Sequence, residues 1–163
     1  MKNVTLIVNK AYVYDEVAKT TSYAGAKMMA EDSTAYDRIF TTDEDRLLLE
    51  RFWNETCNMV TNRLKPFIIS IDSQPISHGI DLSRDYKVEL GLSSSYDDVL
   101  TEAINTSLFN FFVAMIVSKW FVVANKAEAE SYAIASAGIM EDVMRKIYYK
   151  KKPQRVAPYE QGR

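Results

Sequence analysis

The longest apolar stretch of the chain, residues 108–124, constrains the fold more than any other feature of the sequence. Only Asn110, Ser118 and Lys119 interrupt it, and residues 108–117 are apolar on nearly every side of a helix. A membrane-spanning helix needs about 20 largely apolar residues without a charge, so we interpret this stretch as a buried helix. A helix that is apolar all round must lie at the centre of a fold, enclosed by other helices or by neighbouring subunits.

The size and composition of the chain are those of a single globular domain. Its 163 residues match one domain of ordinary size, and 47% of them are hydrophobic, which excludes a disordered chain. Five Gly and four Pro exclude collagen-like and low-complexity structures. We predict one helical domain over residues 1–152 and a polar, basic C-terminal tail over residues 153–163.

Two helices are predicted in the first half of the chain. The first runs from a cap at Asn9 to about Met29, although Gly25 weakens it by about 1 kcal/mol relative to Ala. The second begins at Thr42, with Asp45 at its third position, and ends before Pro66. Its predicted apolar stripe comprises Leu48, Phe52, Met59, Val60 and Leu64, with Trp53 and Cys57 at the edge.

The second half of the chain predicts two further helices. Ser95 is the expected cap of the central apolar helix, which should run to about Val123, with Asp98 completing a capping pair. Asn125 is the expected cap of a fourth helix, and Pro153 ends any helix. An aromatic cluster in the central helix is expected to be core or subunit interface: Phe109, Phe111, Phe112, Trp120 and Phe121.

Short apolar runs predict a small sheet beside the helices. Residues 67–71 and 86–90 read as two strands joined by a long hairpin loop over residues 72–84, and residues 4–8 form a further candidate strand. A lone hairpin is only marginally stable, so this sheet must pack on the helices or on a partner. The predicted fold class is therefore mainly α, a four-helix-bundle-like domain with a small antiparallel β-hairpin or sheet.

The net charge of −2 conceals an uneven distribution. Residues 145–163 carry seven basic side chains and one acidic one, a charge of +6, so the other 144 residues carry −8. A basic segment on an acidic body suggests contact with nucleic acid, a phosphate group or the acidic surface of a neighbouring copy. The alternative is a solvated helix end whose cations offset the helix dipole. The candidate contact residues for a partner or nucleic acid are Arg145, Lys146, Tyr148, Tyr149, Lys150, Lys151, Lys152 and Arg155.

Several enzyme classes lack the residues that they would need. Cys57 and His78 are the only residues of their types, so a zinc site or a di-iron bundle has too few ligands. A nucleophilic Cys57–His78 pair is formally conceivable, but a mid-helix cysteine among apolar residues is typical of a small buried hydrophobe. No phosphate-binding glycine loop or hydrolase elbow occurs. We therefore expect no enzymatic activity, cofactor, metal or small-molecule substrate.

Acidic pairs in the sequence also have explanations other than catalysis. Glu141 and Asp142 precede Arg145 and Lys146, which predicts i,i+4 ion pairs along one helix.

The run at residues 4–8 is too short for a signal-peptide core. Without a signal or a membrane span, and with a single thiol, we expect a cytosolic protein or one assembled from cytosolic subunits.

Six strings carry a resemblance to a known group of proteins: VYDEVAKTT at 13–21, IFTTDEDR at 39–46, KPF at 65–67, SKWF at 118–121, NKAEAESY at 125–132 and MRKIYY at 144–149. Together they resemble a family of small uncharacterised proteins from phage and prophage structural gene clusters, over roughly residues 4–157. The resemblance implies a virion assembly protein, such as a head–tail connector or tail-completion subunit, which would be in the host cytoplasm during assembly and then in the virion. Connector proteins of that kind are small helical bundles that assemble as rings, and the family offers no catalytic residues to transfer.

These observations lead to one expected function and one alternative. We expect a non-enzymatic virion assembly subunit that acts through homo-oligomeric contacts or contacts with other virion proteins. The alternative is a nucleic-acid-binding helical module that uses residues 148–155, because aromatic rings beside cations can stack on bases while contacting phosphates.

Overall fold

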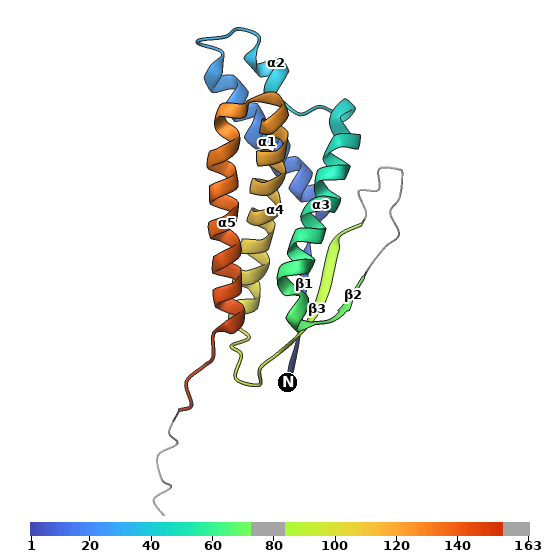
Figure 1. Ribbon diagram of the computed structural model, residues 1–163, viewed down its shortest axis with the longest axis vertical. Coiled ribbons are helices and arrows are strands. Elements are labelled where there is room, and N and C mark those ends of the chain that lie inside the picture. The colour runs from blue at the N-terminus through green and yellow to red at the C-terminus, as the bar shows by residue number, and fades with distance from the viewer. Residues whose placement is uncertain (73–83, 155–163) are drawn as a thin grey trace, which may run out of the picture.

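The computed structural model describes residues 1–72 and 84–154. Within this part of the chain, four long helices lie side by side, and a small sheet packs against them (Figure 1). The long helices are α1 (Lys10–Met28), α3 (Arg46–Leu64), α4 (Leu100–Ala124) and α5 (Lys126–Tyr148). Three shorter helices are α2 (Ala35–Ile39), η1 (Asp43–Asp45) and η2 (Lys65–Phe67). The predicted class, mainly helical with a small antiparallel sheet, is confirmed.

The sheet contains β1 (Lys2–Val8), β2 (Ile68–Ile71) and β3 (Tyr86–Leu92), in the order β1-β3-β2. Strand β3 is central because it pairs with both β1 and β2, and both pairings are antiparallel. The N-terminal strand β1 therefore lies at an edge. Side chains alternate along β1, with Val4, Leu6 and Val8 buried against the helices. The three predicted strands are therefore present, and most of the predicted hairpin loop at residues 72–84 lies outside the described residues.

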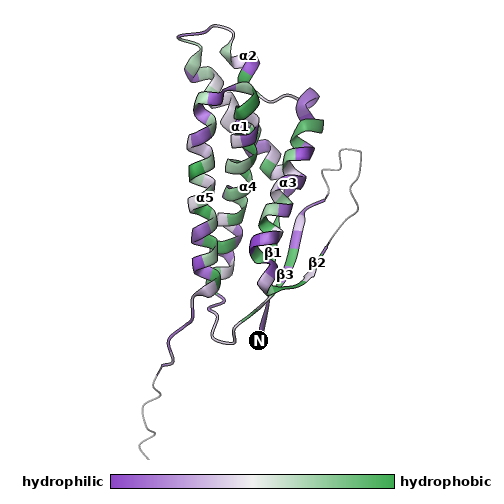
Figure 2. Cartoon of the chain, viewed as in Figure 1, coloured by the Kyte–Doolittle hydropathy of each residue, from purple (hydrophilic) through white to green (hydrophobic). Residues whose placement is uncertain are grey.

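Helix α4 occupies the centre of the bundle, as its composition predicts. It packs against α1, α3, α5 and β1, and none of its residues from 111 to 121 is exposed. Figure 2 shows how strongly apolar residues dominate this helix. Its length and composition alone would allow a membrane span, but half of its apolar window is buried inside this fold, which favours a core helix. The buried aromatic residues of α4 are Phe111, Phe112, Trp120 and Phe121, and Phe109 packs beside them half-buried.

Helix boundaries that depend on local capping agree with the sequence. The Asn9 side chain accepts a hydrogen bond from the Tyr12 amide at 2.9 Å, and α1 begins at the next residue. The Thr42 amide donates to the Asp45 carboxylate at 2.8 Å and starts the turn of η1 that leads into α3. Pro66 lies in η2, immediately after α3 ends.

The predicted apolar stripe of α3 is wrong in part. Met59 is exposed, and Leu49 and Thr56 take buried positions instead. Thr56 can be buried because its hydroxyl donates to the Phe52 carbonyl at 2.7 Å, which satisfies its polar atom within the helix. The buried face of α3 is therefore rotated slightly from the face that hydrophobicity alone predicts.

The predicted start of α4 at Ser95 is also wrong. The helix begins at Leu100, because the preceding residues form turns that use the same polar side chains. The Ser93 hydroxyl accepts from the Ser95 amide at 3.2 Å, and the Asp97 carboxylate accepts from the Val99 amide at 3.3 Å. Such local hydrogen bonds compete with a helix for the backbone.

Two details at the α4–α5 corner and the end of α5 also differ from expectation. Asn125 does occupy the position before α5, but its side-chain amide donates to the Met28 sulfur at 3.3 Å instead of capping the helix. The helix ends at Tyr148, before Pro153 is reached. The Asn125 side chain, which was expected to cap α5, therefore contacts the end of α1 instead.

Helix α2 was not predicted, and its position explains a glycine. A Cβ atom on Gly25 would lie 2.9 Å from the Tyr36 Cα atom, so α1 and α2 can approach this closely only because residue 25 has no side chain. The Trp120 indole then ties α2 to the core by donating to the Ile39 carbonyl at 2.7 Å. The glycine that weakens α1 in isolation is required for this packing.

Candidate functional site

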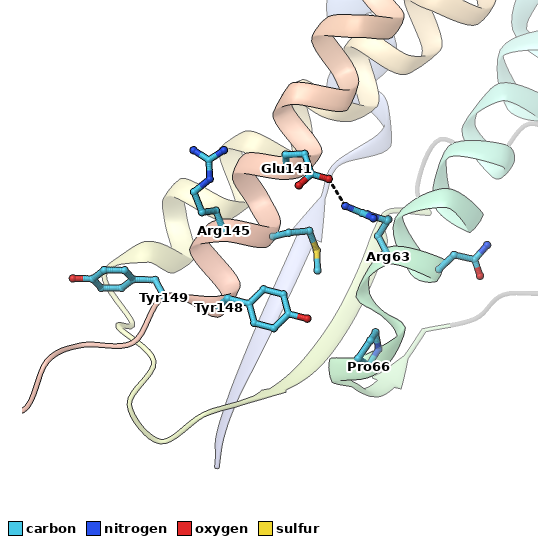
Figure 3. Close-up of a pocket in the computed structure, with 8 residues that line it drawn as sticks. Arg63, Pro66, Glu141, Arg145, Tyr148 and Tyr149 are labelled. Atoms are coloured by element: carbon cyan, nitrogen blue, oxygen red, sulfur yellow. Dashed lines mark hydrogen bonds and ion pairs between the residues drawn. The ribbon is translucent and has the colours of Figure 1, made fainter.

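The candidate contact residues lie where the C-terminal ends of α3 and α5 meet. The Tyr148 ring packs edge-on against Phe67, with the ring centroids 5.2 Å apart. Arg63 of α3 and Glu141 of α5 lie on earlier turns of these helices. The Arg63 guanidinium is 2.5 Å from the Glu141 carboxylate, and this ion pair joins the two helices (Figure 3). We call this part of the molecule the basic end, and it comprises Lys2 and residues 62–67, 93–102 and 141–154.

A groove opens on the basic end between α3 and α5. Its volume is about 560 Å³. The residues that line it combine apolar, aromatic and charged side chains: Asn62, Arg63, Pro66, Glu141, Met144, Arg145, Tyr148 and Tyr149 (Figure 3). The side chains of Tyr148 and Tyr149 are 61% and 53% exposed, which leaves large amphipathic rings available to a partner.

Lys146 is not available to a partner, because it is held within the molecule. Its ammonium donates to the Asp142 carboxylate one turn earlier and to the Ser107 hydroxyl of α4 at 2.9 Å. The Lys146 hydrogen bond is also the main reason that the pKa of Asp142 lies below its ordinary value. This part of the predicted i,i+4 pairing is confirmed, and Lys146 serves to join α5 to α4.

The three lysines that follow α5 differ in their surroundings. The Lys151 amide donates to the Ser95 carbonyl at 2.9 Å, and its ammonium lies 4.0 Å from the Asp97 carboxylate. Lys150 and Lys152 are exposed, and neither forms an ion pair with another residue of the described chain. Of the other predicted contact residues, Arg145 is likewise exposed and unpaired within residues 1–72 and 84–154, and Arg155 lies outside the described residues.

The predicted partner of Glu141 is wrong. The expected i,i+4 pair with Arg145 does not form, because Glu141 pairs with Arg63 across the helix interface. The contributions of Asn62, Arg63 and Pro66 to the groove were also missed. These residues precede the groove residues of α5, which begin at Glu141, by about 80 positions, and no local pattern in the sequence reports a contact between segments so far apart.

A second cluster of polar groups lies inside the bundle. Lys10 and Glu50 form a buried ion pair between α1 and α3, and the Lys10 ammonium lies 5.8 Å from the centre of the Tyr14 ring and 5.7 Å from that of Trp53. Burial, reinforced by the Glu50 carboxylate, raises the pKa of Tyr14 well above its ordinary value. The paired charges are buried beside the two aromatic rings, so we assign this cluster a structural role in the core.

Cys57 lies beside this cluster, and its surroundings are those of a structural cysteine. Burial raises the pKa of its thiol to about 12, so the thiol is protonated at neutral pH and is a poor nucleophile. His78, its hypothetical partner, lies outside the described residues. Among the residues that the structure does describe, no group of three His, Cys, Asp or Glu side chains is arranged to hold a metal ion.

Comparisons of this chain with protein-family models, with curated proteins and with solved structures give no match. The resemblance to phage structural proteins therefore stays a prediction, and the chemistry of the basic end is the main structural indication of function.

Proposed function

We propose that this protein is a non-enzymatic structural subunit of a virion, of the head–tail connector or tail-completion kind. It acts by binding copies of itself or other virion proteins through the basic end. The observation that carries the proposal is the groove, which is lined by the exposed Tyr148 and Tyr149 together with the unpaired Arg145.

The composition of the groove supports a protein partner. Tyrosine, arginine and methionine are enriched in the cores of protein interfaces, and this groove is lined by two tyrosines, two arginines and Met144. Pro66 adds a rigid apolar surface on the α3 side. Such anchors bind best where a partner covers them and excludes water.

Nucleic-acid binding is the second candidate, and the exposed Tyr149 beside Lys150 and Lys152 favours it. We rank it lower because Lys146 is held by Asp142 and Ser107, and Lys151 is anchored through its backbone. Arg63 and Glu141 also line the groove, but they pair with each other, so Arg63 is not a free cation for a phosphate. Few cations therefore remain for the several phosphate contacts that tight binding requires.

Light scattering coupled to size-exclusion chromatography tests the leading proposal. The protein is measured alone and after mixing with the products of the neighbouring genes. We expect a particle heavier than the 18.6 kDa monomer in at least one of these mixtures. Replacement of Tyr148 and Tyr149 by Ser should abolish that particle, whereas replacement of the distant, exposed Tyr23 by Ser should leave it intact. A strictly monomeric protein in every mixture would contradict the proposal.

Titration with fluorescent single-stranded DNA tests the second candidate. Phosphate contacts release counterions, so true binding should weaken steeply between about 50 mM and 200 mM salt. Replacement of Lys150, Lys151 and Lys152 by Ala should then remove most of the affinity. If the triple variant binds like the wild type, or the wild type does not bind, this candidate is rejected.

A further inference from the structure

The fold gathers acidic residues at the end of the bundle opposite the basic end. The last turn of α1, helix α2, the start of α3 and the α4–α5 corner all lie there (Figure 1). Two chain segments, residues 27–46 and 122–130, make up this acidic end, and they carry eight acidic and four basic side chains. The basic end carries eight basic and five acidic side chains. The molecule is therefore a rod with charges of −4 and +3 at its two ends.

The two ends are too far apart to neutralise each other within one molecule. Helix α5 runs from one to the other, and its 23 residues span about 34 Å. Electrostatic interactions are screened over about 8 Å at physiological ionic strength. Each end therefore keeps its own charge available for another molecule.

The acidic end also presents an exposed apolar corner. Val122 and Val123, in the last turn of α4, are 60% and 67% exposed. The hydrogen bond from Asn125 to Met28 holds the end of α1 beside this corner, and the neighbouring Met29 is also exposed. Apolar side chains gathered at a corner and surrounded by charged residues are typical of a binding surface.

The groove at the basic end complements this corner. Met144, Pro66 and the two tyrosines offer apolar surface, and the unpaired Arg145 lines the groove beside them. The exposed Lys150 and Lys152 follow α5 in the chain and add positive charge to the same end of the molecule. The acidic corner has the opposite balance of charge: the two valines are followed in the chain by Lys126, Glu128 and Glu130, and neither glutamate forms an ion pair in the described chain. Opposite charges around apolar centres guide association and fix its orientation.

We propose that the α4–α5 corner of one copy docks into the α3–α5 groove of the next copy. This inference builds on the proposed function and specifies its homo-oligomeric contact. Because two different surfaces meet, the contact is heterologous, and it produces a ring where the rotation closes and a filament where it does not. A second copy is the occupant that supplies both an apolar corner for the groove and negative charge for the unpaired cations of the basic end, Arg145, Lys150 and Lys152.

Charge reversal at each end tests the contact. One variant, R145E/K150E/K152E, makes the basic end acidic, and the other, E31K/D37K/E130K, makes the acidic end basic. Light scattering at low salt should give multimers for the wild type and the 18.6 kDa monomer for each variant alone. An equimolar mixture of the two variants should associate again, because each reversed end then meets an end of opposite charge. Circular dichroism confirms that both variants keep their helices.

Substitution of the apolar corner provides a second test that leaves the charges unchanged. V122S/V123S should weaken association by about tenfold or more, because it removes the apolar centre of the contact. Ile134, equally exposed in the middle of α5, is the matched control, and I134S should associate like the wild type. An effect of I134S as large as that of V122S/V123S would place the contact on the side of the bundle and overturn the inference.

Failure of this inference differs from failure of the proposed function. A wild type that is monomeric alone at low salt, or variants that each form multimers like the wild type, would overturn the end-to-end contact. The proposed function would survive either result if the protein still forms a particle with other virion proteins through Tyr148 and Tyr149. A mixture of the two charge-reversed variants that stays monomeric would also reject the contact.

Discussion

The Lys10 ammonium and the Glu50 carboxylate form an ion pair inside the bundle, with Nζ 2.5 Å from Oε1 and 2.7 Å from Oε2. Their side chains are only 4% and 13% exposed, so solvent screens this pair far less than the surface pairs of the molecule. The pair joins the first turn of α1 to α3. Taking two charges from water is costly, and their mutual attraction offsets that cost only while both are present.

Removal of one partner of this pair should therefore destabilise the protein strongly. We expect Lys10→Met and Glu50→Leu each to lower the free energy of unfolding by about 3–5 kcal/mol, because each leaves a buried charge unpaired. The double variant K10M/E50L should recover much of that loss. Urea denaturation followed by circular dichroism measures all three values. Losses under about 1 kcal/mol in both single variants would show that the pair is dispensable.

Two glycines in helices should respond in opposite ways to alanine. Gly25→Ala should lower the free energy of unfolding by about 1–3 kcal/mol, because the new Cβ would press on the Tyr36 backbone at 2.9 Å. Gly138 has no atom within 4 Å of an added Cβ, so Gly138→Ala should raise the free energy of unfolding by about 0.5–1 kcal/mol. Thermal and urea unfolding of both variants provide the comparison. A stabilising Gly25→Ala would refute the close approach of α2.

The indole of Trp120 should contribute through its hydrogen bond as well as its size. Trp120→Phe removes the donor to the Ile39 carbonyl and leaves that carbonyl without this buried partner. We expect a loss of about 1–3 kcal/mol in the hydrogen bond and a further loss from the smaller ring. Hydrogen exchange should show faster opening of α2 in the variant, and unchanged exchange there would mean that the bond does not hold α2 in place.

Stability should fall at alkaline pH because burial raises the pKa values of several acids, Tyr14, Cys57 and Tyr86 among them. Burial raises the pKa of Cys57 to about 12 and that of Tyr86 to about 12. In the unfolded chain these groups lose their protons near their ordinary values of 9.0 and 10.0, while the folded protein keeps them. The unfolded state then binds fewer protons, so the free energy of unfolding falls as pH rises from about 9 towards 12.

Urea titrations between pH 7 and pH 11 measure this dependence. The stabilising effect of the protonated groups should be fully present below pH 9, and the decline should begin above it. Cys57→Ala should make the decline shallower, because one of the titrating groups is removed. A wild-type free energy of unfolding that is constant across this range would contradict the buried positions of both groups.

Features governed by neighbouring residues could be predicted from the sequence. The caps at Asn9 and Thr42 depend on residues three positions away, and both form as expected. The central position of α4 follows from its composition, since a helix without a polar face has no side to turn to water. The prediction that α4 starts at Ser95 was wrong because the same serines and aspartates can form either a helix cap or local turns, and here they form turns.

Features that depend on distant segments could not be predicted in this way. Glu141 had a suitable cation one turn away in Arg145, yet it pairs with Arg63 of α3. The buried pair of Lys10 and Glu50 joins residues 40 positions apart, and neither lies in a recognisable motif. Such partners are selected when helix faces pack, and many pairings are compatible with the same local patterns.

Four long helices, a small sheet, a buried central helix and a charge of +6 over residues 145–163 against −8 elsewhere all follow from the amino-acid sequence. The positions of those charges in space depend on how the helices pack. This packing brings residues 27–46 and 122–130 together at one end and sets the basic groove at the other, about 34 Å away. The physical reason is that helix formation depends on contacts within a few residues, whereas the surfaces of the molecule arise from packing between segments far apart in the chain.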